Sequence, residues 1–327
     1  MRKFILLFSV FFWISSAAFS EVKIKFASLA PEGTTWMKVM RAYDLELQKE
    51  TSGRVQFIFF AGGVAGDEKD VLRKMRYDKI HATAITGLGM GQIVPEARIL
   101  DLPFFFANNV QVDRVQQSLF DHFSKKFDEQ GYRFVSWSNP GWTYLFSSQN
   151  LGQTEQYPKL KTWSWEGDVV ALEALKILGI TPISLPIADV LISLQTGLLD
   201  TVYAPPLAAI ALQWDAKVSF FLETPLVHAS GALLITKNQF EKMSPPDQNL
   251  FLKLGKKYIS ELNLQTRIEN QKALEALKNG KLTSISPDIS LKTLIEKVSM
   301  ETPKILTGKL FSAEMLHKTI EIRDQNT

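Results

Sequence analysis

The sequence predicts an α/β protein of two lobes, each a mostly parallel sheet covered by helices. Strand-like and helix-like segments alternate near the start of the chain, and the same alternation begins again after residue 160. Such alternation is typical of parallel sheets with helices packed on their faces. A third observation is the extended stretch 132–148 between the two regions, which indicates two lobes joined by a crossing rather than one sheet.

The composition is that of a folded chain without cysteine chemistry. The 327 residues are 46% hydrophobic and include 22 Phe and 7 Trp, which is incompatible with disorder. The absence of Cys excludes disulfides, thiolate metal sites and cysteine nucleophiles. Lys and Arg number 37 against 34 Asp and Glu, so the charge gives no indication of a nucleic-acid partner.

The first twenty residues have the pattern of a secretory signal peptide. Two basic residues precede the apolar run 4–14, and Ala18-Phe19-Ser20 has the small-x-small spacing of a cleavage site. The run is too short for a stable membrane anchor, although an anchor or a buried helix is the alternative interpretation. No later window of about 20 residues is apolar enough to span a bilayer. We therefore expect the mature chain to be exported and soluble.

The first alternating region follows directly. Residues 22–26 alternate apolar and polar side chains, as a half-buried strand does, and Thr34 or Thr35 caps a helix that ends at Gly53. The elements expected next are a strand at 55–60, a helix at about 67–77 and a strand at 81–85. The second region is predicted to hold strands at 160–165, 181–184 and 200–203 and helices at 168–178 and 188–196.

The last third of the chain is predicted to hold one very long helix. Residues 244–247, Ser-Pro-Pro-Asp, form a typical helix start, and no strong breaker follows until Gly280. A helix over 245–279 would span roughly 50 Å at about 1.5 Å per residue, which is longer than one lobe. We expect it either to break near Asn263 or to lie across both lobes.

Motifs for enzymatic or cofactor chemistry are largely missing. The sequence has no phosphate-binding Gly-Lys-Ser/Thr loop, no nucleophile elbow and no His-Glu-x-x-His, and its four His are far apart. Gly87, Gly89 and Gly91 follow a predicted strand, but Gln92 occupies the third glycine position of the dinucleotide fingerprint. A turn that brings the backbone close to a ligand or another segment is the better interpretation. No enzyme activity, cofactor or metal is predicted.

Aromatic residues gather at the ends of predicted strands, where open α/β sheets bind ligands. They are Trp142 and Tyr144 in the crossing stretch, Trp163 and Trp165 before a helix, and Tyr203 and Trp214 after a further strand. Packing in a core is the alternative for each single ring. Because several groups occupy equivalent places, a shared aromatic-lined cleft is the favoured interpretation.

Six segments occur in an order that matches a known family. They are FASLAPEGTTW (26–36), GGVAGDEKDVLRKMR (62–76), PEARILDLPFFF (95–106), LKTWSWEGD (160–168), LQTGLLD (194–200) and SGALLITKNQFEKMSPPDQ (230–248). With them the chain resembles the periplasmic substrate-binding subunits of tripartite ATP-independent periplasmic (TRAP) transporters, of DctP type, over about residues 22–286.

This resemblance implies a type II periplasmic-binding-protein-like fold, with two α/β lobes, a central cleft and a long helix bracing both lobes. The boundaries expected are a signal peptide at 1–20, lobe I at 21–143 plus about 226–327, and lobe II at 144–225. It also implies a small organic ligand captured by lobe closure and delivery to TRAP membrane subunits, and we expect a monomer. The alternatives are a binding protein of an ABC-type importer, an exported enzyme using the same cleft, and a scaffold without a cleft.

One departure from the family pattern concerns the ligand. In most members an Arg on the strand corresponding to 160–164 grips the substrate carboxylate, and here Trp163 stands at that position. Two further positions, often Arg and Asn in the family, are Thr143 and Ala204. A carboxylate in such a cleft would lose its hydration without gaining a cation, so we expect a largely apolar or aromatic ligand with one polar end. An alignment shifted by two residues would instead let Lys161 supply the cation.

The predicted ligand-binding residues combine these rings with a few polar neighbours. Stacking is expected to contribute roughly 0.5 to 1.5 kcal/mol per ring contact beyond area burial. Since Trp faces attract cations and Glu166 and Asp168 lie nearby, an organic cation is a second ligand class, although Asp168 is also placed to cap a helix. The full set is Trp36, Thr86, Trp142, Tyr144, Trp163, Trp165, Glu166, Tyr203 and Trp214.

Overall fold

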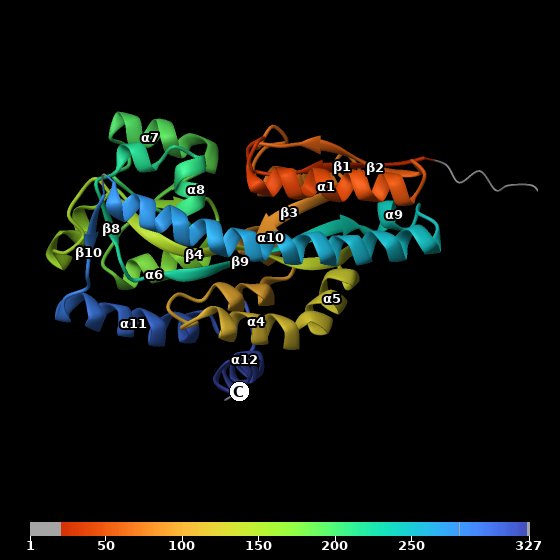
Figure 1. Cartoon of the computed structure of the whole chain (residues 1–327). Helices are drawn as coiled ribbons and strands as arrows, with labels where there is room; N and C mark the ends of the chain where they lie inside the picture. Colours follow the sequence, from red (N-terminus) through yellow and green to blue (C-terminus); the bar gives the residue numbers. More distant parts are fainter. Residues whose placement is uncertain (1–20, 281, 326–327) are drawn as a thin grey trace, which may run out of the picture.

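The computed structural model in Figure 1 describes residues 21–280 and 282–325. The predicted signal peptide, residues 1–20, lies outside the described residues. Within the described part of the chain, no helix is long and apolar enough to cross a membrane.

A mixed sheet of eight strands runs through the molecule, in the order β10-β8-β4-β9-β3-β1-β2, with β7 also paired to β4. Its strands are β1 (Val22–Ala27), β2 (Val55–Phe60), β3 (Ala82–Thr86), β4 (Tyr132–Ser147), β7 (Thr201–Ala204), β8 (Phe220–Leu222), β9 (Val227–Thr236) and β10 (Thr283–Ile285). A separate parallel pair consists of β5 (Trp163–Trp165) and β6 (Ile183–Leu185). One lobe is built around β1–β3 and the other around β5–β8, which confirms the predicted two-lobe α/β fold.

The strands that connect the lobes correct one part of the prediction. Strands β1, β2 and β3 are parallel, as expected, but β4 pairs antiparallel with β7, β8 and β9, and β9 pairs antiparallel with β3. The two lobes therefore share one hydrogen-bonded sheet instead of holding two separate ones. The reason is the length of β4, whose 16 residues extend over roughly 50 Å and contribute to both ends.

Helices cover both faces of this sheet. They are α1 (Thr35–Glu50), α2 (Glu68–Arg76), α3 (Gly87–Ile93), α4 (Asn109–Ser118), α5 (Phe120–Glu129), α6 (Val169–Ile177), α7 (Val190–Thr196), α8 (Pro206–Ala211), α9 (Lys237–Phe240), α10 (Pro245–Asn279), α11 (Ile289–Leu306) and α12 (Ala313–Asp324). Short 3-10 helices are η1 (Pro95–Asp101), η2 (Thr154–Lys159), η3 (Ile187–Asp189) and η4 (Asp215–Lys217). The expected turn at 87–91 is wrong, because these residues form α3.

Helix α10 is continuous over 35 residues, so the predicted break near Asn263 is absent and the helix lies across both lobes. Figure 1 shows it passing α8 at one end and α1 at the other. Ser244 caps its start by accepting a hydrogen bond from the Asp247 amide, as predicted. Gly255 permits close packing on β4, because a Cβ there would lie 2.4 Å from Val135 Cγ1.

Strand β4 is irregular where it passes from one lobe to the other. Its register with β9 shifts between Ser138 and Gly141, and Gly141 has φ +113°, a conformation that favours glycine. Two amides of α10 bind the backbone there: Asn263 contacts Trp137 O and Asn139 N, and Asn270 donates to Pro140 O. The long helix therefore satisfies peptide groups at the point where the strand pairing is interrupted.

Candidate functional site

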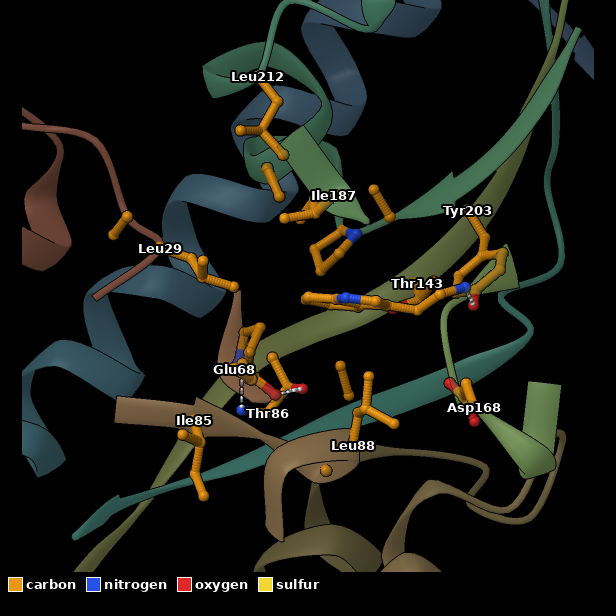
Figure 2. A pocket seen from close by; sticks show the side chains of 18 of the residues that line it. Leu29, Glu68, Ile85, Thr86, Leu88, Thr143, Asp168, Ile187, Tyr203 and Leu212 are labelled. Carbon is orange, nitrogen blue, oxygen red and sulfur yellow. Dashed lines mark hydrogen bonds between the residues drawn. The ribbon is translucent and has the colours of Figure 1, made fainter. Parts of the chain in front are cut away.

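A cavity of about 880 Å³ lies between the lobes. Residues from loops and strand ends of both lobes line it, and α10 contributes Thr266 and Glu269. Figure 2 shows Leu29, Ile187, Leu212 and Tyr203 arranged around this space. The volume falls in the range of pockets that enclose small molecules, and the lining is mainly apolar.

One side of the cavity is an aromatic cluster, formed by Trp163, Trp165, Tyr203 and Trp214. The Trp163 ring stacks on Tyr203, with centroids 4.9 Å apart, and meets Trp165 at 5.6 Å and the edge of Trp214 at 5.3 Å. Trp163 is only 1% exposed and donates its indole N–H to Leu185 O, 3.0 Å away. Trp165 is half-buried. Trp163 is therefore the packed centre of the cluster, and Trp165 presents more of its ring to the cavity.

Six of the nine residues predicted as ligand-binding line the cavity: Trp36, Thr86, Trp163, Trp165, Tyr203 and Trp214. Three are elsewhere. Trp142 packs against His228 and donates to Asn109 Oδ1, Tyr144 packs beside the core of its lobe, and Glu166 is largely exposed, 3.5 Å from Lys69 Nζ. Trp142 and Tyr144 lie away because they alternate in position along the crossing strand with Thr143, which does line the cavity.

The positions at which the sequence departs from the family pattern are found in and near the cavity. Thr143 and Ala204 line it together with Trp163. Lys161, the alternative cation, is exposed and donates to Gly197 O at 2.9 Å, outside the cavity lining. Asp168 caps α6 by accepting from the Ala171 amide, as its position before the helix predicted.

A charged side of the cavity, which we call the charged cluster, is formed by Arg98, Asp101, Asp168 and Glu68, of which only Asp168 was singled out from the sequence. Arg98 Nη2 lies 2.7 Å from Asp168 Oδ1, and Arg98 Nε lies 3.2 Å from Asp101 Oδ2. Burial lowers the pKa of the guanidinium, but the two carboxylates outweigh it and keep that pKa above its usual value. Burial also raises the pKa of Asp101 to about 6, against the opposing effect of Arg98. Among the described residues that line the cavity, Arg98 carries the one guanidinium, and two acids already share it.

Glu68 also belongs to the charged cluster, but hydrogen bonds from neutral groups hold it in place of ion pairs. It is 2% exposed, and its carboxylate accepts hydrogen bonds from Thr86 N at 2.6 Å, Thr86 Oγ1 at 2.9 Å and Gly89 N at 2.9 Å. Figure 2 shows the pair from Thr86. Burial raises its pKa to about 7, more than these hydrogen bonds lower it.

The glycines of α3 explain how these charges fit. A Cβ on Gly87 would lie 1.5 Å from Asp101 Oδ2, one on Gly89 2.7 Å from Glu68 Oε2, and one on Gly91 2.6 Å from Arg98 Cγ. Each glycine thus leaves space for one charged side chain. The expectation that these glycines allow close approach to another segment is confirmed, although the approach occurs at a helix instead of a turn.

Several contacts bridge the cavity from one lobe to the other. Asp67, the N-cap of α2, accepts from the Trp165 indole N–H at 2.9 Å and from the Ile187 amide at 3.2 Å. The Arg98–Asp168 ion pair also crosses between η1 and the start of α6. The aromatic cluster and the charged cluster are therefore connected through the chain's own residues.

Weak signals for the charged cluster exist in the sequence. Arg98 and Asp101 interrupt an otherwise apolar stretch at i, i+3 spacing, and Asp67-Glu68 directly follows a glycine-rich loop. No three His, Cys, Asp or Glu of the described residues come together in a way that could hold a metal ion.

Comparisons with known proteins point in one direction. The family described as bacterial extracellular solute-binding protein, family 7 (DctP), matches residues 26–305. The 2,3-diketo-L-gulonate-binding periplasmic protein YiaO of Escherichia coli is 22% identical over 240 residues, or 72% of each chain. A TRAP periplasmic solute-binding protein from Pseudomonas putida F1, solved with D-glucuronate, has a TM-score of 0.85 at 18% identity, covering 94% of this chain and 98% of its own. Another, from Sulfurospirillum deleyianum with succinate, has a TM-score of 0.84 at 16% identity, covering 93% and 99%.

Proposed function

The chain belongs to the DctP family of TRAP-transporter solute-binding proteins, and from this premise we propose that its cleft captures a small organic ligand that is apolar or aromatic rather than a small carboxylate. The protein is a binding protein and not an enzyme, so the predicted alternative of an exported enzyme is set aside.

The observation that carries the ligand class is the state of Arg98. Its guanidinium is the only cationic group among the described residues that line the cavity, and Asp101 and Asp168 already flank it. A ligand carboxylate brought to Arg98 would be a third acid beside a single cation, and it would have lost its hydration. The relatives solved with D-glucuronate and succinate bind such acids; here Trp163 is the packed centre of an aromatic cluster, and Trp165 presents ring surface to the cavity.

The ligand residues we propose are the six predicted ones that line the cavity, joined by Thr143. Ring faces of the aromatic cluster supply apolar contact area, and each ring contact contributes about 0.5 to 1.5 kcal/mol beyond its buried area. Hydroxyl groups of Thr86 and Thr143 are placed to fix the polar end of the ligand.

For closure we propose the predicted division, with one lobe formed by 21–143 and about 226–327 and the other by 144–225. On this division the hydrogen bonds of Asp67 and the Arg98–Asp168 pair join the lobes across the cleft. A ligand that touches both lobes stabilises this closed arrangement by its differential affinity. The closed monomer then docks on the TRAP membrane subunits in the periplasm.

The direct test is to identify what the purified protein carries. We expect native mass spectrometry and solvent extraction to yield a molecule with an apolar or aromatic body. D-glucuronate and succinate at 10 mM should leave the melting temperature unchanged. Tight binding of either acid would contradict the ligand class.

A variant pair assigns the site. Trp165→Phe and Trp142→Phe each replace one indole by a smaller ring, but only Trp165 lines the cavity. The extracted ligand should bind the first variant several-fold more weakly and the second with unchanged affinity, measured by titration calorimetry. Equal losses in both variants would remove Trp165 from the site.

A further inference from the structure

The cavity lining has a strongly one-sided charge. Besides Arg98, the Asp and Glu residues that line it in the described part of the chain are seven: Asp67, Glu68, Asp70, Asp101, Asp168, Asp189 and Glu269. Arg98 is the one cation among these described lining residues, and Arg73, outside the lining, pairs with Asp70. A cleft lined by charge of one sign attracts ligands of the opposite sign, because its low-dielectric walls concentrate the field.

We propose that the ligand carries a positively charged nitrogen, which lies on the Glu68 side of the cleft while its apolar body covers the aromatic cluster. This inference rests on the proposed function, since it names the chemical class of the polar end of the same ligand. Amines and amidines joined to a flat or branched apolar body are the compounds concerned.

Glu68 is the carboxylate best placed to receive this group. Asp101 and Asp168 already flank Arg98, and Asp70 lies 2.7 Å from Arg73. No Lys, Arg or His of the residues described in the structure pairs with Glu68, although it is almost fully buried. Its two oxygens accept three hydrogen bonds and have capacity for about four, so one acceptor position is left. An incoming cation would compensate a buried charge that is otherwise held only by neutral donors.

The aromatic cluster suits the same group. Ring faces of Trp and Tyr attract cations through their quadrupoles, most strongly where water is excluded. Trp165 is fixed by its indole bond to Asp67, which is the chain neighbour of Glu68. The same short segment therefore orients both the ring and the carboxylate.

The carboxylates are spread around the cavity, and this arrangement favours an organic cation over a metal ion. Within the described ranges, no three acidic or His side chains converge on one point. A divalent ion needs several oxygens at about 2.0 to 2.6 Å, whereas an ammonium group needs one or two acceptors and tolerates ring faces. An organic cation also fills the apolar part of the cavity.

The test compares molecules that differ only in the charge at one end. Three series are used, with indolyl, phenyl and cyclohexyl bodies, each ending in an ammonium, a hydroxyl or a carboxylate group; the indolyl members are tryptamine, tryptophol and indole-3-propionate. Melting temperatures are measured with each compound at 1 mM and low salt, and dissociation constants of responding compounds by calorimetry.

The amine of at least one series should bind at least tenfold more tightly than its alcohol, and more tightly still than its acid. An acid that binds as well as its amine would overturn the inference and leave a ligand-binding cleft intact. An extracted native ligand without a cationic nitrogen would do the same. If none of the nine compounds binds, the result would count against both this inference and the proposed function.

A matched pair of variants locates the charge. Glu68→Gln and Glu166→Gln each replace an ionisable carboxyl group by a neutral amide of similar shape, but only Glu68 lines the cavity. Glu68→Gln should weaken binding of the responding amine about tenfold while its alcohol changes less than threefold; Glu166→Gln should change neither by more than twofold. Equal effects of both variants would show that the amine responds to overall charge and would overturn the assignment to Glu68. Should Glu68→Gln fail to fold, Asp67→Asn tests the same side of the cleft with the same expectation.

Discussion

The two sides of the cleft differ in what holds them together and in how visible they are in the sequence. The aromatic cluster is held by ring packing around Trp163, and its members are prominent because Trp is rare and gathers at strand ends. The charged cluster is held by a glycine-containing helix, by the local ion pair Arg98–Asp101 and by the pair Arg98–Asp168 between distant segments. Apolar contact is short-range and tolerant, while buried charge depends on every partner. Substitutions in the charged cluster should therefore lower the free energy of unfolding more than substitutions in the aromatic cluster.

The largest effect is expected from Arg98→Met. Removing the guanidinium leaves Asp101 and Asp168 buried without their cation, which should lower the free energy of unfolding by about 3 to 5 kcal/mol. Urea denaturation measures this. The control Arg41→Met breaks an exposed pair with Glu32 and should cost less than about 1 kcal/mol. Similar losses of unfolding free energy in the two variants would contradict the view that the charged cluster depends on the buried cation.

The next effect concerns pH and Glu68. A carboxyl whose folded pKa is about 7, against 4.5 unfolded, binds its proton more tightly in the folded state. The contribution of this protonated carboxyl to the free energy of unfolding is fully present below about pH 4.5 and is lost as pH rises through 7. The unfolding free energy of the wild type should therefore fall by up to about 3 kcal/mol between pH 4.5 and 8, relative to Glu68→Gln. Parallel pH profiles for the two proteins would contradict the raised pKa.

A smaller effect is expected from Gly87→Ala. The new Cβ would overlap Asp101 Oδ2, so the carboxylate must move away from Arg98, at a cost of about 1 to 3 kcal/mol by thermal unfolding. In Gly152→Ala the nearest atom is 3.2 Å away, on the Asn150 side chain, and the change should be within about 0.5 kcal/mol. If the cost of Gly87→Ala stays the same in an Asp101→Ala background, the glycine does not serve the carboxylate.

The smallest effect on stability should come from the aromatic side. Trp165→Phe removes the indole donor to Asp67, at about 1 kcal/mol, because the remaining ring still packs on Trp163. Small-angle scattering of the ligand-free variant should show a wider average separation of the lobes. Trp142→Phe loses a bond to Asn109 that does not cross the cleft, so its scattering should match the wild type.

The sequence predicted the elements well where local chemistry decides them. Thr34 and Ser244 cap the helices that they were expected to cap, and the helix ending at Asn279 runs to its predicted limit. The antiparallel joining of the lobes was missed, because pairing between β4 and β9 depends on residues about 90 positions apart, and no local pattern encodes it.

The site was predicted in the same uneven way. Rings could be placed in a cleft from their position after strands, but Trp142 and Tyr144 could not be separated from Thr143, since alternation along a strand is unreadable until the register is known. Glu68 and Arg98 were missed because a charged residue in a helix or loop is solvated by default. Their burial depends on packing against Gly89 and Gly91 of α3, and no local pattern around Glu68 or Arg98 shows that packing.

The amide side chains of α10 have a consequence for movement. At residues 138–141 the strand loses its regular partner, yet Asn263 and Asn270 anchor the free peptide groups, and Asn270 also binds the Leu207 amide of α8. Because these peptide groups keep their hydrogen-bond partners, the strand can change its backbone angles here without exposing them to water. We therefore expect the two lobes to open and close by rotating about residues 138–141, with α10 keeping the axis of that rotation constant.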